Sequence, residues 1–155
     1  MSDGKSAPAR LRLAKVADAI PLADLRFEWD QPNSAPSDEE RRNFAALFED
    51  WFVAAQPWCA CAVAEVGDQL IGMAWLVIHQ RVPNPSRFNR ATGEIQSVYV
   101  RPNQRRRGVG QGLVKLLLDY GEQRDVARFT VDANDRAIRF YQRLGFTNSP
   151  LMLER

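Results

Sequence analysis

One stretch of this sequence constrains the fold more than any other, because an apolar strand leads through a loop of arginines and glycines directly into a helix. It reads IQSVYVRPNQRRRGVGQG over residues 95–112. We expect a strand over residues 94–100, ended by Pro102, and a helix over residues 109–121, whose apolar side chains recur at helical spacing. The unpaired N–H groups at the start of such a helix can bind an anion.

The loop suits a pyrophosphate group. Its arginines at 105–107 carry planar guanidinium groups that match phosphate, and Gly108, Gly110 and Gly112 let the backbone approach a ligand closely. Two common phosphate cradles do not fit. The P-loop pattern is missing, and Leu113 stands where a dinucleotide fingerprint needs its third glycine. A glycine-rich turn with a solvated arginine cluster is the alternative that these residues leave open.

The rest of the chain predicts a mixed α/β arrangement. Ser37 and Glu40 match the capping box of a helix that ends before Pro57. Further helices are expected at 17–29 and 135–144, further strands at 10–13, 59–66, 70–80, 129–132 and 151–153, and a loop at 81–93. The resulting order, β-α-α-β-β-β-α-β-α-β, indicates a central mixed sheet with helices on both faces.

The length and charge of the chain bound its class. Its 155 residues fit one domain, which we place at residues 9–155 after a flexible tail at 1–8. The net charge of +2 argues against bulk binding to nucleic acid or to a membrane surface. No apolar run approaches the roughly 20 residues of a membrane span. Residues 1–10 also lack the apolar core of a signal peptide, so a cytoplasmic location is expected.

The cysteines and the histidine limit the chemistry further. Cys59 and Cys61 are the only cysteines, and His79 is the only histidine. Since a zinc site needs about four ligands, we expect no metal site. A Ser/His/Asp or Cys/His arrangement would also depend on His79, for which a surface or capping role beside a loop is expected.

Two motifs, in order and on the expected elements, resemble those of the GNAT N-acetyltransferase superfamily. The pattern Arg105-x-x-Gly108-x-Gly110 matches the family signature [QR]-x-x-G-x-[GA], and it follows a strand that resembles the fourth strand of the family. Downstream, NDRAIRFYQRLGF at 134–146 resembles the block N-x-x-A-x-x-F-Y-x-x-x-G-F. The resemblance covers roughly residues 59–153. It implies a GNAT-like fold whose fourth and fifth strands splay apart.

The resemblance also implies a cofactor, acetyl-CoA, and a reaction in which an acetyl group moves to an amine by direct attack. The pantetheine arm of coenzyme A would lie between the splayed strands, and its pyrophosphate would lie on the arginine and glycine loop. The cofactor-binding residues implied in this way are Val98, Tyr99, Val100, Arg105, Arg106, Arg107, Gly108, Val109, Gly110, Gln111, Gly112, Asn134 and Tyr141.

Two catalytic roles follow from the same resemblance. Tyr141 matches the general acid that protonates the leaving thiolate, and the N–H near Val98 is the candidate donor to the developing oxyanion. An amine is mostly protonated at neutral pH, so it needs a proton acceptor. Glu94 is the candidate base, and we expect it to share a strand face with Val98. Gln96, nearer the thioester, cannot act as a base.

The acceptor would be a small-molecule or peptide amine. In the family its site is lined by the first two helices and the loop after the third strand, which here means Trp29, Glu49, Asp50, Trp51 and residues 81–93. An alternative function is a catalytically inactive, GNAT-like regulatory domain that binds coenzyme A. A nucleic-acid-binding module is disfavoured, because residues 101–107 form only one short basic cluster. A homodimer is compatible with this fold.

Overall fold

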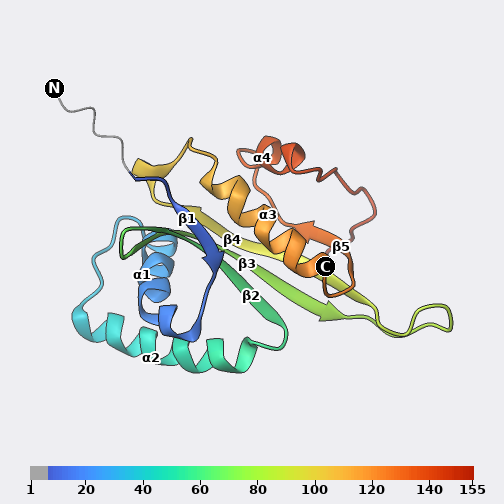
Figure 1. Cartoon of the computed structure of the whole chain (residues 1–155), viewed down its shortest axis with the longest axis horizontal. Helices are drawn as coiled ribbons and strands as arrows, with labels where there is room; N and C mark the ends of the chain where they lie inside the picture. The colour runs from blue at the N-terminus through green and yellow to red at the C-terminus, as the bar shows by residue number, and fades with distance from the viewer. Residues whose placement is uncertain (1–6) are drawn as a thin grey trace.

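The computed structural model describes residues 7–155, so most of the tail expected at 1–8 lies outside the described residues. Five strands form one sheet in sequence order (Figure 1), antiparallel except for the last pair, which is parallel. The strands are β1 (Arg10–Leu13), β2 (Cys59–Val66), β3 (Gln69–Gln80), β4 (Ala91–Val100) and β5 (Val126–Val131). The helices are α1 (Ala19–Asp30), α2 (Asp38–Ala55), α3 (Val109–Glu122) and α4 (Ile138–Arg143).

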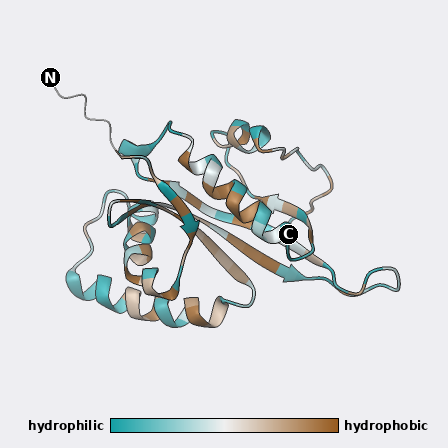
Figure 2. Ribbon diagram, in the orientation of Figure 1, coloured by the Kyte–Doolittle hydropathy of each residue, from teal (hydrophilic) through white to brown (hydrophobic). Residues whose placement is uncertain are grey.

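Helices cover both faces of the sheet, as the sequence predicts. One core lies between the sheet and α1 with α2, and the other lies between the sheet and α3 with α4. Successive residues of β2 contribute to different cores. Cys59 and Cys61 face the first core, whereas Ala60 and Ala62 face the second. Apolar residues accordingly concentrate in the strands and on the inner sides of the helices (Figure 2).

The predicted capping box begins α2. The hydroxyl of Ser37 accepts a hydrogen bond from the Glu40 N–H at 3.2 Å, and the Glu40 carboxylate accepts one from the Ser37 N–H at 2.7 Å. These bonds favour the ionised carboxylate and lower the pKa of Glu40. Local sequence therefore determines where this helix starts.

Three boundaries differ by three residues from the sequence-based prediction, and one predicted element does not form. Strand β4 begins at Ala91 rather than at residue 94, because its first three residues pair with the end of β3, from Ile78 to Gln80. Strand β5 begins at Val126, and α4 begins only at Ile138. The strand predicted at 151–153 is wrong: the three consecutive apolar residues there remain exposed and pair with no strand in the described part of the chain. Within residues 7–155, no helix combines the length and the apolarity that crossing a membrane requires.

The sheet opens between β4 and β5. The two strands pair only as far as Ile95 and Val131, although β4 continues to Val100. Just beyond that point the register with β3 shifts, and Ser97 adopts a φ of 49°. This geometry is that of a β-bulge, which bends the strand that carries it. The expected separation of the fourth and fifth strands is therefore present, and it begins at the bulge.

Candidate active site

A run of unpaired backbone N–H groups lies in the turn before α3. Arg106 and Gly108 have φ values of 63° and 76°, and no side chain caps the helix. The first intrahelical bond is donated by Gly112 to the Gly108 carbonyl at 3.0 Å. Among the described residues, the N–H groups from Arg106 to Gln111 have no recorded partner. They form a concave donor set at the positive end of a helix dipole, which suits an anion.

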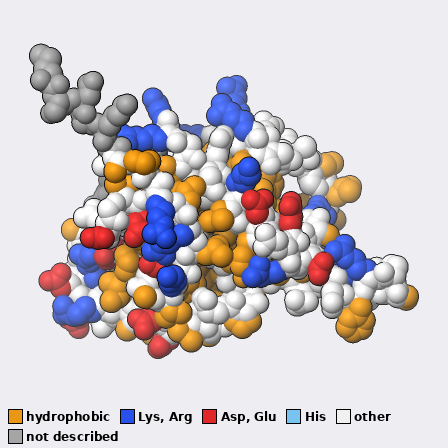
Figure 3. Space-filling model, in the orientation of Figure 1, with side chains coloured by type: hydrophobic (Ala, Val, Ile, Leu, Met, Phe, Trp, Pro, Cys, Tyr) orange, Lys and Arg blue, Asp and Glu red, His pale blue; other side chains and the backbone are white. Residues whose placement is uncertain are grey.

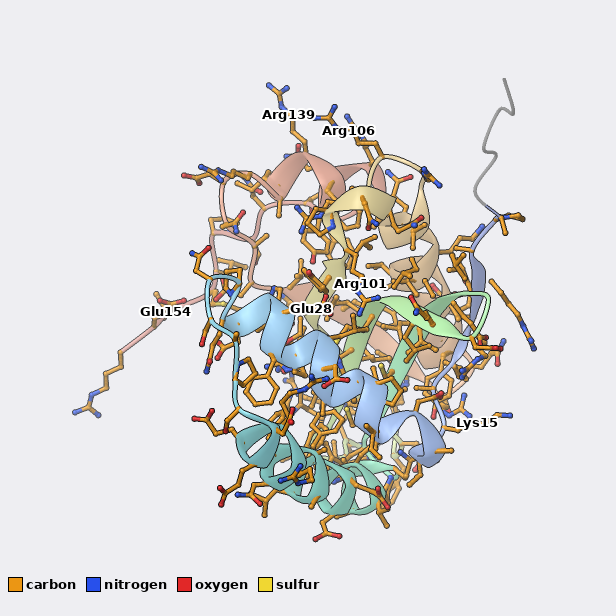
Figure 4. All side chains as sticks on the ribbon, turned by 90° about the vertical axis from the view of Figure 1, so that its left-hand side faces the viewer. Lys15, Glu28, Arg101, Arg106, Arg139 and Glu154 are labelled. Carbon is orange, nitrogen blue, oxygen red and sulfur yellow. The ribbon has the colours of Figure 1, made fainter. Side chains whose placement is uncertain are left out.

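The three arginines of this turn have different surroundings. The Arg105 Nε donates to the Val100 carbonyl at 2.8 Å, so this side chain ties the turn to the end of β4. Arg106 and Arg107 are exposed, and Arg106 extends outward at the same end of the molecule as Arg139 of α4 (Figure 4). Basic side chains gather along this edge of the surface (Figure 3). The turn therefore presents two arginines to an incoming anion and uses the third to hold its own position.

Two of the glycines in the motif serve packing. A Cβ on Gly110 would lie 3.3 Å from the Phe140 ring of α4, and a Cβ on Gly112 would overlap the Leu11 side chain of β1. Because the Gly112 amide is bonded to Gly108, it is not free for a ligand. Gly108 has open space around it, and its positive φ is the property that the turn requires.

The bulge at Ser97 reverses the side-chain alternation of β4. Before it, Glu94 pairs with Val77 and Gln96 pairs with Trp75, and both partners belong to the core on the α1 and α2 face. After it, Val98 and Val100 pack against the core on the α3 face. Glu94 and Gln96 therefore do not share a face with these two valines, and the sequence-based expectation was wrong because one extra residue shifts the two-residue period.

A pocket opens on the α1 and α2 face beside the bulge. It is lined by Arg26, Phe44, Leu47, Phe48, Trp51, Cys59, Trp75, Val77, Gln96 and Ser97. The rings of Trp51 and Phe48 lie 5.6 and 5.7 Å from that of Trp75, so much of the wall is a packed aromatic cluster. This pocket reaches the splayed strand from the side opposite to α3.

Only part of the expected acceptor region lies in this pocket. Trp51 lines it, whereas Trp29 stacks against the Arg26 guanidinium at 4.6 Å and is itself outside. Glu49 lines a separate groove between α1 and α2, and Asp50 is exposed. The loop between β3 and β4 projects away from the body of the domain (Figure 1). Sequence reasoning missed Phe44 and Trp75, for which helical and strand periodicity indicates only core positions, and Arg26, for which the sequence carries no signal.

Glu94 has a partner that the sequence did not suggest. Its Oε2 lies 3.4 Å from the Nε2 of His79 on β3. Glu94 stands directly opposite Val77, a pocket residue, and is two positions before Gln96 on the same face. Both side chains of the pair reach solvent, with 36% of Glu94 and 53% of His79 exposed. A carboxylate and an imidazole therefore link the edge of the pocket to water.

Tyr141 lies on the other face of the sheet, on α4. It is buried, and its ring packs edge-on against Phe140 and Phe146, with centroids 4.9 and 5.6 Å apart. Burial raises the pKa of its hydroxyl, so the group keeps its proton through the neutral range. Asn134 accepts a hydrogen bond from the Ala137 N–H at 3.1 Å and so shapes the turn that leads into α4.

Comparisons with known proteins agree with this geometry. A model of the Acetyltransferase (GNAT) family matches residues 23–146. A mycothiol acetyltransferase of Acidimicrobium ferrooxidans is 33% identical over 123 residues, which are 77% of this chain and 36% of that protein. A glucosamine 6-phosphate N-acetyltransferase of Trypanosoma brucei brucei is 31% identical over 78 residues, 50% of this chain and 51% of that protein. The chain thus matches about a third to a half of the length of these curated relatives.

The fold is also found among solved structures. A predicted acetyltransferase of Clostridium acetobutylicum, whose crystal structure was solved with acetyl-CoA, superposes with a TM-score of 0.72. The superposition covers 95% of this chain and 95% of that one, at 18% sequence identity. At that identity the likeness concerns the fold alone.

Proposed function

Because the chain belongs to the GNAT acetyltransferase family, we propose that it is an N-acetyltransferase that moves an acetyl group from acetyl-CoA to an amine by direct attack. One observation carries the proposal. The sheet opens at Ser97 with an anion-binding turn at the end of the same strand and an aromatic pocket on one face. A site of this form can hold two substrates next to each other. Holding them together can lower the activation barrier by about 7–11 kcal/mol.

The residues of the turn fit a pyrophosphate. The N–H groups from Arg106 to Gln111 would hold its oxygens, with Arg106 and Arg107 adding charge, while Arg105 keeps the turn against Val100. When bound, coenzyme A supplies an acetyl thioester as the activated group. Val98 has no partner in the register with β3, and we assign its N–H as the donor to the carbonyl oxygen at the reacting centre.

Tyr141 is the proposed general acid. A group that must deliver a proton to a thiolate has to remain protonated at the working pH, and the raised pKa of the buried hydroxyl meets this condition. Its ring is held by two aromatic neighbours, which fixes the direction of the hydroxyl. Asn134 positions the turn before the same helix.

Glu94 is the proposed proton acceptor for the amine, with His79 as its partner. An acceptor amine arrives protonated at neutral pH and must lose a proton before it can attack. Glu94 is on the pocket face of β4, and His79 lies 3.4 Å away on the solvent side. A proton taken by Glu94 can pass to His79 and then to water. Gln96, closer to the bulge, can only donate or accept hydrogen bonds.

The acceptor is proposed to be a small-molecule or peptide amine that binds in the pocket of Trp51 and Trp75. Residues 9–155 are proposed to work as one domain. A cytoplasmic location agrees with Cys59 and Cys61, which are both free and buried thiols. An inactive domain that binds coenzyme A is less well supported, because it has no use for a Glu94–His79 pair beside the pocket.

Calorimetric titration with acetyl-CoA, combined with an assay of amine-dependent thiol release, tests the proposal. We expect micromolar binding that weakens as salt rises, and thiol release that requires both an amine and the protein. Absence of binding would overturn the proposal. Binding without thiol release across chemically diverse amines would favour the inactive domain.

A further inference from the structure

Arg26 is the one charged residue among those that line the aromatic pocket. It lies on α1, half buried, and it forms no ion pair within the described part of the chain. Two acids of the same helix are already engaged, since Glu28 binds Arg101 at 2.7 Å and Asp24 binds Arg41 at 2.8 Å, and the third, Asp30, forms no ion pair with Arg26. Arg26 therefore borders a largely apolar pocket without a carboxylate paired to it.

Burial of this charge carries a desolvation cost. Burial lowers the pKa of Arg26, and Asp30 on the same helix offsets only part of that effect. Removing a cation from water is costly unless an anion compensates it. The Arg26 guanidinium also stacks over Trp29 at 4.6 Å, which orients its planar fork. A guanidinium that is held over a ring and has no ion pair is suited to a carboxylate, which it binds through two parallel hydrogen bonds.

The other residues that line the pocket indicate the chemistry of the rest of the ligand. Phe44, Phe48, Trp51 and Trp75 present apolar surface, and Gln96 with Ser97 are the only uncharged polar side chains that line the pocket. The pocket has no acidic lining residue that would attract a polycation. It also has few groups that could satisfy the hydroxyls of a sugar. The amine of a bound acceptor belongs near Ser97, where the strands part, with Glu94 three residues earlier on the same strand.

We infer that the acceptor is an amino acid with an apolar, preferably aromatic, side chain, whose carboxylate binds Arg26 while its amine faces the bulge of β4. The inference rests on the proposed acetyltransferase function and names the substrate class of that site. A single guanidinium without a lysine or helix N-terminus beside it matches the one charge of a carboxylate better than the two of a phosphate.

A matched set of amines tests this assignment. Free L-phenylalanine, L-phenylalaninamide and 2-phenylethylamine share the ring and the amine but differ in the carboxylate. The corresponding β- and γ-amino acids vary the distance between amine and carboxylate. We expect kcat/KM to be about 10- to 100-fold higher for the best amino acid of this set than for its amide or its decarboxylated form.

The variants Arg26→Gln and Arg26→Lys separate charge recognition from folding. Arg26→Gln should raise KM for the amino acid about 10- to 100-fold with little change in kcat, and should leave the amide unaffected. Arg26→Lys should recover part of the loss, because it keeps the charge without the bidentate fork. Arg124→Gln is the matched control, since that guanidinium stacks on Tyr120 at the far end of α3.

The outcomes are distinguishable from a failure of the function itself. If acetyl-CoA does not bind in calorimetry, the proposed function fails. If it binds but the amide is acetylated as well as the amino acid, the inference fails while the function stands. The inference also fails if spermidine or a lysine peptide is the better acceptor, if no amino acid of the set is acetylated, or if Arg26→Gln affects all amines equally.

Discussion

Arg101, at the end of β4, binds Glu28 of α1 through two hydrogen bonds of 2.7 and 3.0 Å (Figure 4). The contact joins the open end of the sheet to the helix that carries Arg26, across 73 positions of sequence. The same carboxylate accepts a weak bond from the Tyr99 hydroxyl at 3.4 Å. This pair therefore sets how closely α1 approaches the strand that opens to form the site.

Glu28→Gln should destabilise the fold by about 1 kcal/mol. The pair is bidentate but about a third exposed, so solvent screens much of its attraction. The measurement is urea unfolding followed by tryptophan fluorescence. Asp24→Asn, which breaks the more exposed pair with Arg41, is the control and should have the smaller effect. Equal effects of the two variants would show that Glu28 has no special structural role.

Arg106→Ala and Arg107→Glu should weaken the binding of acetyl-CoA, with the charge reversal having the larger effect. Both side chains are exposed beside the unpaired N–H groups of the turn, so their contribution should shrink as salt screens it. Calorimetry at low and moderate ionic strength measures this. The phosphate cradle would be contradicted if the protein bound coenzyme A and a pantetheine fragment without phosphates equally well.

Tyr141→Phe should lower kcat about 100-fold or more while leaving the affinity for coenzyme A unchanged. The loss reflects the missing proton donor, since the ring and its packing are kept. The pKa of Tyr141 is raised above its ordinary value near 10, so wild-type kcat should lose this donor only in strongly alkaline solution. Steady-state rates measure kcat, and binding isotherms measure the affinity for coenzyme A. Unchanged turnover would remove Tyr141 from the mechanism.

Glu94→Gln should lower kcat/KM at neutral pH by about 10- to 100-fold, and His79→Gln should lower it less. Without a proton acceptor, attack depends on the fraction of free amine in solution. The rate of the Glu94 variant should therefore rise more steeply with pH than that of the wild type. A pH profile of kcat/KM from pH 6 to 9 measures this, with Glu122→Gln at the end of α3 as the control. Parallel profiles would mean that Glu94 does not take the proton.

Much of the architecture can be predicted from the sequence because it depends on local patterns. The capping box of Ser37 and Glu40 starts α2 where expected. The apolar run of β2 predicts a strand that is buried on both faces, and the helical periodicity of α3 predicts a helix that is buried on one face. The arginine and glycine turn is also visible as a motif, since its conformation depends on adjacent residues such as Gly108.

The arrangement of the site depends on contacts between distant segments, which periodicity cannot supply. The bulge at Ser97 is defined by pairing with β3, and it alone decides that Gln96 and Val98 face opposite sides of the sheet. The pairing of Glu94 with His79 follows from the same register. The short apolar run at 151–153 predicts a strand that does not form, because a strand also needs a partner. Local sequence thus determined the helices and the five strands that find a partner, whereas the packing of α1 and β4 decided which side chains, Arg26 among them, share one pocket.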